Sequence, residues 1–515
     1  MVKSNGFPIL YAILLAAAFC VKVAEAQINH GCPAPAQSDF RLVQLVNKTN
    51  AQLTEPMKMD FDMDAQNNTD IYFVERNGRA SKYDAKTKAI VRLGQLPAVK
   101  PQTEHGLTGI ALDPGFKTNR YIYFFHSTNS STQQVSRYTL NGAGTLDMAS
   151  AKMVIQWGVQ SGWHSAGAMK FDNQGNLFIA VGENNAPDNG PANTNDLRGN
   201  ILRIKINADG TYGIPAGNLF PPGTAQTKPE IYVMGVRNPY TINYDNKTGR
   251  LVWGCIGPDG TGRPTEEHNM TTKPGFFGWP YFAGKNEVLR AGKIPSAPIN
   301  NAANNTGLQN LPPAQPALHA YGQASAITGP IFRYNGLIKS AVSLPPHFDG
   351  VWFTTDYNRP QEIDTIGVNA AGTAMTGMAR VFTSIGVSHP LDMQQGPDGA
   401  LYVLNYGGPD FGSGPTTTIS RVEYTGPCRP ELSSSVATPN GTRPAFAARG
   451  LVFTVGEANY RLRVTDLKGR EVYSFRSEAA GRHDLTEPLR GRIGIHMVTV
   501  QTPRGSHTMK VVLKS

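Results

Sequence analysis

The chain has 515 residues, of which 40% are hydrophobic and 17% charged, so it can bury a substantial core and is not a disordered protein. Its formal net charge of +10 is uneven, because from Arg429 onward 14 Lys and Arg residues stand against seven Asp and Glu residues. These basic residues alternate with strand-forming residues, which indicates a solvated strand face and argues against a nucleic-acid partner, with an acidic polymer or the envelope surface as the alternatives.

The first 26 residues have the layout of a cleavable secretory signal. Lys3 precedes the apolar run FPILYAILLAAAFC at residues 7–20, and the small-residue site Ala24-Glu25-Ala26 follows. A spanning helix needs about 20 apolar residues, and this run is shorter. We therefore expect residues 1–26 to be removed and the protein to be secreted or held at the cell surface.

A two-strand unit recurs along residues 38–428, in which an apolar strand, a turn with Asp or Gly and a second strand follow one another. Four clear copies and two degenerate ones occupy residues 106–127, 167–183, 240–255 and 391–407, and residues 70–84 and 348–363. Their turn cores, such as DNQG and GPDG, tolerate the positive φ of tight connections. One motif that returns around the chain predicts an all-β fold, a six-bladed β-propeller, whereas a pair of sandwiches would not repeat it.

The last 87 residues differ in composition from these repeats. Residues 429–450 are rich in Pro, Ser, Thr and Gly and predict a linker. Residues 451–515 contain alternating runs such as YRLRVTDLKGREVYSF and GIHMVTVQT, which predict a small C-terminal β-sandwich. This stretch resembles the C-terminal sorting domains of the bacterial type IX system, which would make outer-membrane export machinery a partner. An Ig-like adhesion module or a carbohydrate-binding module is the alternative.

The cysteines give two further expectations. Cys32 and Cys428 stand at the two ends of the predicted propeller, and in an oxidising compartment we expect them to form a disulfide. Cys255 lies inside the apolar strand LVWGCIG and is expected to be a buried thiol. No CxxC or Cys/His cluster is present in the sequence, which argues against a zinc site.

Residues from about Phe40 to Tyr424 resemble the glucose/sorbosone dehydrogenase family, the soluble sugar dehydrogenases that use pyrroloquinoline quinone (PQQ). The resemblance is carried by GLTGIALDPGFKTNRYIYF, HSAGAMKFDNQGNLFIAVGE and GNILRIKINADGTYGIPAGNLF. It continues in EIYVMGVRNPY, GFFGWPYFAG and QQGPDGALYVLNYG. A GPDGxLY turn occurs in many propellers, but GIPAGNLF, GVRNPY and FGWP in this order are together much more specific.

The resemblance implies roles for four polar residues. His164 stands where the family has its catalytic base, and a neutral imidazole suits the removal of a proton from a sugar hydroxyl. Glu183 stands where the family has the Asp that orients this histidine. Arg237 and Asn238 match the pair that contacts the cofactor, and a guanidinium would stabilise negative charge that forms on the quinone oxygens. The catalytic set implied is therefore His164, Glu183 and Arg237.

The resemblance also implies a calcium site and a substrate contact. Gly257 and Pro258 match the Gly-Pro whose main-chain carbonyls bind calcium in the family, and calcium prefers such hard oxygen ligands. Glu104 stands where the family often has Gln. With the adjacent His105, it is the candidate for contact with the substrate.

The sequence departs from the family at the basic residues that anchor PQQ, which has three carboxylates. Where the family has a Lys in its fifth blade, this chain has Tyr357-Asn358-Arg359. In the sixth blade only His389 is present, and Leu391 occupies the position of the second basic residue. Arg359 and His389 are therefore the remaining candidates for binding the cofactor carboxylates.

These observations favour an exported quinoprotein dehydrogenase that oxidises a sugar or a sugar-derived alcohol. Hydride would pass to PQQ with calcium assistance, and an external quinone or cytochrome would accept the electrons, because the sequence contains no CxxCH haem motif. The alternative is a non-catalytic propeller that binds glycan or protein and is attached to the cell envelope. The incomplete basic anchors favour this alternative, while His164, Arg237 and Asn238 favour the enzyme.

Overall fold

The structure of the chain is a computed structural model. It describes residues 34–426 except 98, 188–189, 323, 337, 339, 360–361 and 409–413, and then residues 446–449, 452–455, 458–466, 469–479, 481–485, 488–489, 494–503 and 505–513. The chain divides into an N-terminal unit, Met1–Pro430, and a C-terminal unit, Glu431–Ser515. The predicted signal at 1–26 and both Cys32 and Cys428 lie outside the described residues. Within those residues, no helix is long and apolar enough to cross a bilayer.

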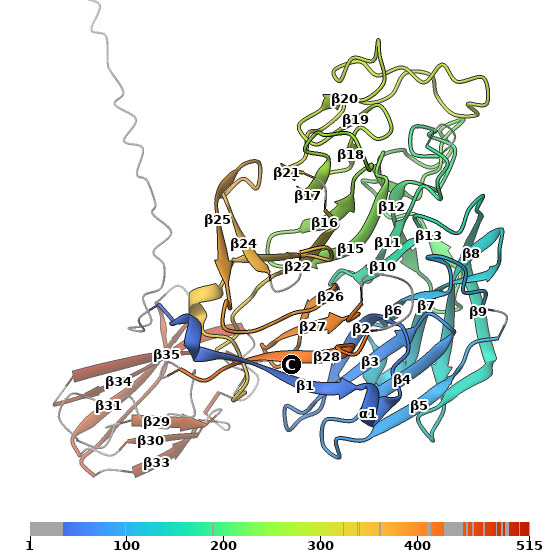
Figure 1. The fold of residues 1–515 in the computed structure, drawn as a ribbon. Coiled ribbons are helices and arrows are strands. Elements are labelled where there is room, and N and C mark those ends of the chain that lie inside the picture. Colours follow the sequence, from blue (N-terminus) through green and yellow to red (C-terminus); the bar gives the residue numbers. More distant parts are fainter. Residues whose placement is uncertain are drawn as a thin grey trace, which may run out of the picture. The chain divides into compact units, whose positions relative to one another are not determined.

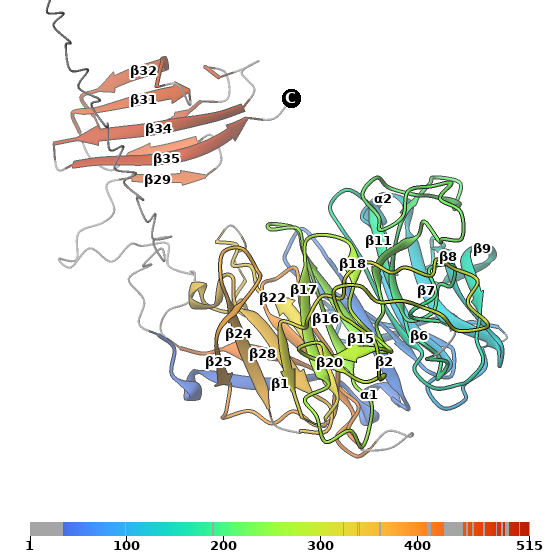
Figure 2. The same cartoon turned by 90° about the horizontal axis from the view of Figure 1, so that it is seen from above.

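Six sheets of four or more strands follow one another through the described part of the N-terminal unit (Figures 1 and 2). The first two are β2 (Pro56–Met63), β3 (Thr69–Glu75), β4 (Arg79–Tyr83) and β5 (Ile90–Gln95), and β6 (Leu107–Leu112), β7 (Tyr121–Asn129), β8 (Thr132–Leu140) and β9 (Leu146–Gly158). The third is β10 (Ala166–Phe171), β11 (Asn176–Val181), β12 (Asn200–Ile206), β14 (Ile231–Met234) and β18 (Gly275–Phe276), with β13 (Tyr212–Gly213) beside β12. The fourth is β15 (Asn238–Asp245), β16 (Arg250–Ile256), β17 (Glu266–Thr271) and β21 (His319–Tyr321).

The last two sheets bring the two ends of this unit together. They are β22 (Ala326–Ile331), β23 (Trp352–Asp356), β24 (Ile363–Val368) and β25 (Met375–Val381), and β26 (Pro390–Gln395), β27 (Leu401–Asn405), β28 (Thr418–Tyr424) and β1 (Phe40–Asn47). The short elements are β19 (Phe282–Ala283), β20 (Glu287–Val288), α1 (Lys48–Ala51), α2 (Phe116–Asn119) and the 3₁₀ turns η1 (Gln37–Asp39) and η2 (Pro346–Phe348).

The first strands of the six sheets form a ring. In it β2 contacts β6, and contacts continue through β10, β15, β22 and β26 back to β2. The N-terminal strand β1 completes the sixth sheet by pairing antiparallel with β28, from Phe40 opposite Tyr424 to Asn47 opposite Thr418. This β-propeller arrangement leaves no long open edge between the first and last sheets, which is how radial β folds avoid edge-to-edge association.

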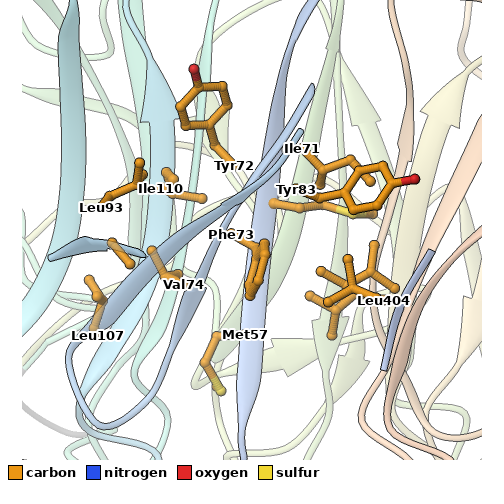
Figure 3. Close-up of a cluster of buried hydrophobic side chains, with 14 of the residues drawn as sticks. Met57, Ile71, Tyr72, Phe73, Val74, Tyr83, Leu93, Leu107, Ile110 and Leu404 are labelled. Atoms are coloured by element: carbon orange, nitrogen blue, oxygen red, sulfur yellow. The ribbon is translucent and has the colours of Figure 1, made fainter. Parts of the chain in front are cut away.

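Turn residues and apolar alternation explain these strands. Between β10 and β11 the Asp172 carboxylate accepts hydrogen bonds from the backbone N–H groups of Gln174 and Asn176, and Gly175 has a φ of +77°. Only a residue without a Cβ adopts this conformation at little cost. The apolar side chains then fill the space between sheets, as in the cluster of Figure 3, where Phe73, Val74, Leu107 and Leu404 meet.

The repeated motif is placed differently in its clear and degenerate copies. The four clear copies form the first and second strands of their sheets, β6–β7, β10–β11, β15–β16 and β26–β27. The degenerate copies at 70–84 and 348–363 instead cover second and third strands, because residues 70–84 contain β3 and β4, and β23 lies at 352–356. Cys255 is a buried free thiol, as expected, and burial raises its pKa.

The C-terminal unit contains two sheets in its described residues. One is β29 (Phe446–Arg449), β30 (Val452–Val455) and β33 (Gly481–Asp484), and the other is β32 (Glu471–Ser477), β31 (Tyr460–Asp466), β34 (Gly494–Thr502) and β35 (Gly505–Leu513). Buried apolar side chains of this unit form one cluster that includes Tyr460, Leu462 and Val498. Because β29 pairs with β30, the segment expected to be a linker at 429–450 already contains a strand of this unit.

Candidate active site

His164 and Glu183 form a hydrogen-bonded pair beside the first two strands of the third sheet. His164 precedes β10, Glu183 follows β11, and the imidazole Nδ1 lies 2.5 Å from Oε1 of Glu183. The Glu183 side chain is only 1% exposed, and His164 is 13% exposed. A carboxylate on Nδ1 fixes the tautomer in which Nδ1 carries the proton, which leaves Nε2 as the basic nitrogen. The Glu183 side chain therefore reaches the histidine from the end of β11.

The backbone around His164 is held in an uncommon conformation. His164 has a φ of +52° and Ala166 also has +52°, a region that costs non-glycine residues about 1–3 kcal/mol. The carbonyl of His164 accepts hydrogen bonds from the backbone N–H and the side-chain amide of Asn184. A Cβ on Gly182 would lie 1.8 Å from that carbonyl oxygen, so only glycine permits this approach. The surrounding strands thus determine the position of the imidazole.

Glu104 and Asn238 connect this segment to the second and fourth sheets. Glu104 Oε2 accepts hydrogen bonds from the backbone N–H of Ser165 (3.0 Å) and from the side-chain amide of Asn238 (3.2 Å). Asn238 in turn accepts from the backbone N–H of Ala166 at 3.1 Å. Glu104 therefore positions the His164 segment. His105, the other candidate for substrate contact, is completely buried, and burial lowers its pKa.

Arg237 continues the same network toward the predicted calcium residues. Its carbonyl accepts from the backbone N–H of Glu183 at 2.9 Å, and its guanidinium donates to the carbonyl of Ile256 at 3.1 Å. The next residue, Gly257, donates its backbone N–H to the buried carboxyl of Glu266 at 3.1 Å. Burial raises the pKa of Glu266 to about 8. A Cβ on Gly257 would lie 2.3 Å from the carbonyl oxygen of Thr265, so glycine is required here too.

Arg359 and His389 belong to neighbouring parts of the same ring. The guanidinium of Arg359 lies 5.1 Å from the ring centre of Tyr321, whose hydroxyl donates to Asp356. The His389 ring lies 5.1 Å from that of Tyr357, and partial burial lowers its pKa. Neither residue is hydrogen-bonded to the His164–Glu183 pair in the described residues.

A sequence comparison with protein families now identifies the chain. The profile of the family described as glucose/sorbosone dehydrogenase matches residues 53–409. The chain belongs to the glucose/sorbosone dehydrogenase family. All of the residues from Glu104 to His389 described above lie inside the matched region, so the network is built within the dehydrogenase part of the chain.

Individual relatives agree with the family assignment. The aldose sugar dehydrogenase YliI of Escherichia coli is 26% identical over 336 residues, which cover 64% of this chain and 82% of the relative. The quinoprotein glucose dehydrogenase B of Acinetobacter calcoaceticus is 26% identical over 244 residues, 42% of this chain and 48% of that protein.

Solved structures show the same fold. The apo form of the soluble aldose sugar dehydrogenase of Escherichia coli gives a TM-score of 0.56 at 21% identity, covering 75% of this chain and 99% of that one. The PQQ-bound aldose sugar dehydrogenase of Streptomyces coelicolor gives 0.54 at 19% identity, covering 76% and 99%. At this level of identity the likeness is one of fold.

Lys58 is the residue in the ring of this dehydrogenase that the sequence analysis missed. It lies on β2, is 3% exposed, and its ammonium stands 3.9 Å from the ring centre of Tyr240 on β15. The signal was available, because Lys58 interrupts an otherwise apolar beginning of a strand, Pro56-Met57-Lys58-Met59. No repeat or motif includes it, and a single lysine in a strand is usually solvated.

The described residues contain no group of three or more His, Cys, Asp or Glu side chains arranged to hold a metal ion.

Proposed function

We propose that this protein is an exported quinoprotein dehydrogenase that oxidises a sugar or sugar-derived alcohol with PQQ as hydride acceptor. We infer that the six sheets are the blades of one six-bladed propeller, since their first strands contact one another in a ring. The observation that carries the function is the His164–Glu183 pair, joined through the Glu183 N–H to the carbonyl of Arg237 in a member of this family. The main chain that carries the partner of the proposed base is thereby joined to the main chain of Arg237.

The residues present suit a planar polyanion with carbonyl oxygens. Arg237 provides a cation, and the indole of Trp279 lies 5.9 Å from the Arg237 guanidinium. The buried indole Nε1 of Trp279 has no hydrogen-bond partner among the described residues, so this N–H group could donate to an oxygen of a bound ligand. Arg359 adds a second, exposed cation at the fifth sheet. We infer that Arg237, Asn238, Arg359 and His389 would hold PQQ, and that the carbonyls of Gly257 and Pro258 would hold calcium.

Bound PQQ would supply the two-electron acceptor, with calcium polarising its quinone carbonyl. The chain's own contribution is proton removal and charge stabilisation. His164 Nε2 would take the proton of the sugar hydroxyl while the adjacent C–H bond yields its hydride, so that the alcohol carbon becomes a carbonyl. Glu183 would stabilise the resulting imidazolium through its bond to Nδ1. The Arg237 guanidinium would stabilise the negative charge of the reduced cofactor.

The surface next to His164 suits a sugar. Trp163 is 45% exposed and directly precedes the proposed base. An aromatic ring provides a flat apolar face for the C–H side of a sugar while its hydroxyls meet polar groups. We infer that Trp163 contacts the substrate together with Glu104, which is partly exposed. His105 is buried, so we infer that it supports the segment around Glu104 from within the core.

A titration tests this function. Purified protein would be titrated with PQQ, once with added calcium and once with a calcium chelator. Aldoses would then be added together with an artificial electron acceptor. We expect saturable binding that calcium strengthens, and turnover that His164→Ala lowers by about 10²–10⁴-fold without a comparable loss of PQQ affinity. The exposed His347, on η2, gives the control His347→Ala, which should retain parental turnover.

The outcomes separate the two candidate functions. Turnover by His164→Ala at the parental rate would refute the assigned base. A parent protein that binds no PQQ would refute the enzyme and favour the non-catalytic propeller that binds glycan or protein at the envelope. The incomplete family anchors at Tyr357-Asn358-Arg359 and at Leu391 are the observation that favours this second function.

We also propose that the protein is secreted or held at the cell surface and passes electrons to an external quinone or cytochrome. The C-terminal unit would be a β-sandwich, since its two sheets share one apolar cluster. We propose that this sandwich engages outer-membrane export machinery. A chain truncated after Pro430 should fold and oxidise sugar but remain in the periplasm. Surface delivery of the truncated chain would exclude the export role, and its aggregation would exclude independent folding of the N-terminal unit.

A further inference from the structure

Lys58 is a buried cation that forms no direct ion pair with a described residue, although the charges of Asp392 and Glu104 act on it. Its ammonium donates to the carbonyls of Met57 (3.3 Å) and Leu391 (3.2 Å). Burying an unpaired ammonium is costly, because two neutral carbonyls do not replace the hydration of a charge. Lysine is almost never fully buried unless an anion pairs with it.

The contacts of the Lys58 ammonium locate it within the ring of sheets. Met57 and Met59 belong to the apolar cluster between sheets, and Figure 3 shows Met57 within it. Tyr240 and Leu391, which the Lys58 ammonium contacts, are members of the same cluster. Lys58 reaches Tyr240 on β15, although β15 is not a neighbour of β2 in the ring, whose neighbours are β6 and β26. The ammonium therefore lies inside the ring of first strands.

The surroundings of the ammonium are those of the proposed cofactor site. Tyr240 follows the cofactor residue Asn238 by two positions, and Leu391 follows His389 by two. The carboxylates of Asp392 and Glu104 are the charges that raise the pKa of Lys58, and Glu104 is hydrogen-bonded to Asn238. Burial lowers the pKa of Lys58 to about 8 while these two carboxylates oppose the fall, so the ammonium form predominates at neutral pH.

We propose that Lys58 is the cation that binds a carboxylate of the quinone cofactor in place of the basic residue missing at Leu391. The ammonium lies 3.2 Å from the main-chain oxygen of Leu391, so β2 supplies a charge at the place where β26 lacks one. A lysine suits this task because its long stem carries a compact charge across the ring, where it can turn from a carbonyl to a carboxylate. This inference rests on the proposed function, since it names a residue of the same site.

The experiment compares binding of PQQ and of its trimethyl ester, which lacks the three negative charges. Both are titrated in calcium, with quenching of tryptophan fluorescence as the readout, against the parent and against Lys58→Met, Lys58→Arg and the control Lys247→Met. Lys247 lies in the turn after β15, with 65% of its side chain exposed. We expect Lys58→Met to bind PQQ about 10–100-fold more weakly, the range of a charge-assisted hydrogen bond, and to bind the ester as the parent does.

The conservative variant and a charge relocation complete the test. Lys58→Arg should keep most of the affinity for PQQ, and Leu391→Lys added to Lys58→Met should recover part of it. Equal PQQ affinity of the parent and Lys58→Met would overturn the role of Lys58 and leave the proposed function intact. Equal losses for PQQ and for the ester would also overturn it, because the lysine would then act through structure. Absence of PQQ binding by the parent would instead overturn the proposed function.

Discussion

Replacing Lys58 by Met should make the protein more stable in the absence of cofactor. The pKa of this buried ammonium falls from its ordinary value of 10.5 to about 8, a difference that corresponds to about 3 kcal/mol against the folded state at neutral pH. Met has a similar length and no charge. It loses the two carbonyl hydrogen bonds, which are worth about 1 kcal/mol each. The expected net gain is therefore about 1–2 kcal/mol.

The stability gained by Lys58→Met should depend on pH in a direction set by the lowered pKa of Lys58. Between pH 8 and 10.5 the unfolded chain binds a proton at this lysine that the folded chain does not, so the unfolding free energy of the parent rises with pH in this window. The penalty is fully present below pH 8 and absent above about 10.5. The advantage of Lys58→Met should therefore be largest at pH 7 and shrink toward pH 10.

Denaturant unfolding of the full chain without cofactor, followed by tryptophan fluorescence at pH 7 and pH 10, measures this difference, with Lys58→Arg as the variant that keeps the charge. A Lys58→Met protein that is less stable than the parent at pH 7 would refute the reasoning. So would a gain that is the same at both pH values, because it would not come from the ammonium. The combination of higher stability and weaker PQQ binding is what a residue retained for function would show.

Three further changes test the rest of the site. Glu183→Gln should lower turnover by on the order of 10²-fold or more, because it removes the carboxylate charge that contacts His164 Nδ1. PQQ affinity should be unchanged in a fluorescence titration. Gly182→Ala should lower both the thermal midpoint and turnover, because its Cβ would lie 1.8 Å from the His164 carbonyl, whereas Gly213→Ala, with nothing within 4 Å, should change neither. The pKa of Glu266, raised to about 8, means that the parent loses stability as pH rises from 4.5 through 8, and Glu266→Gln should flatten this profile in denaturant unfolding; an unchanged profile would contradict the assignment.

Local features of the sequence predicted much of the fold. The geometry of a turn such as DNQG can be predicted from its own residues, because the Asp172 carboxylate and the positive φ of Gly175 lie within the same four residues. Closure of the ring is not local in this sense. β1 and β28 are separated by most of the chain, and neither contains a residue that specifies the other, so their pairing emerges only when the sheets are assembled.

The strand β29 was missed for a related reason. Its residues, Phe446–Arg449, follow a stretch rich in Ser, Thr and Pro, and composition averaged over that stretch outweighed four residues whose partner is β30. The third sheet likewise gains β18 from a segment about 40 residues beyond β14, a parallel pairing that no turn announces. Short strands whose hydrogen bonds go to distant segments carry little periodicity of their own.

The candidate site divides in the same way between local and spatial information. His164, Glu183, Arg237 and Asn238 could be named from motifs because each stands at a fixed place beside its strand. Comparing the sequence with the family motif position by position also shows that Leu391 is not basic. Such a comparison does not show whether a residue from another strand takes its place. A binding site requires charge at a point in space, and any strand that lines the ring can supply it. Lys58 reaches the main-chain carbonyl of Leu391 from another sheet, and under our proposal it supplies the cation that the sequence lacks at that position.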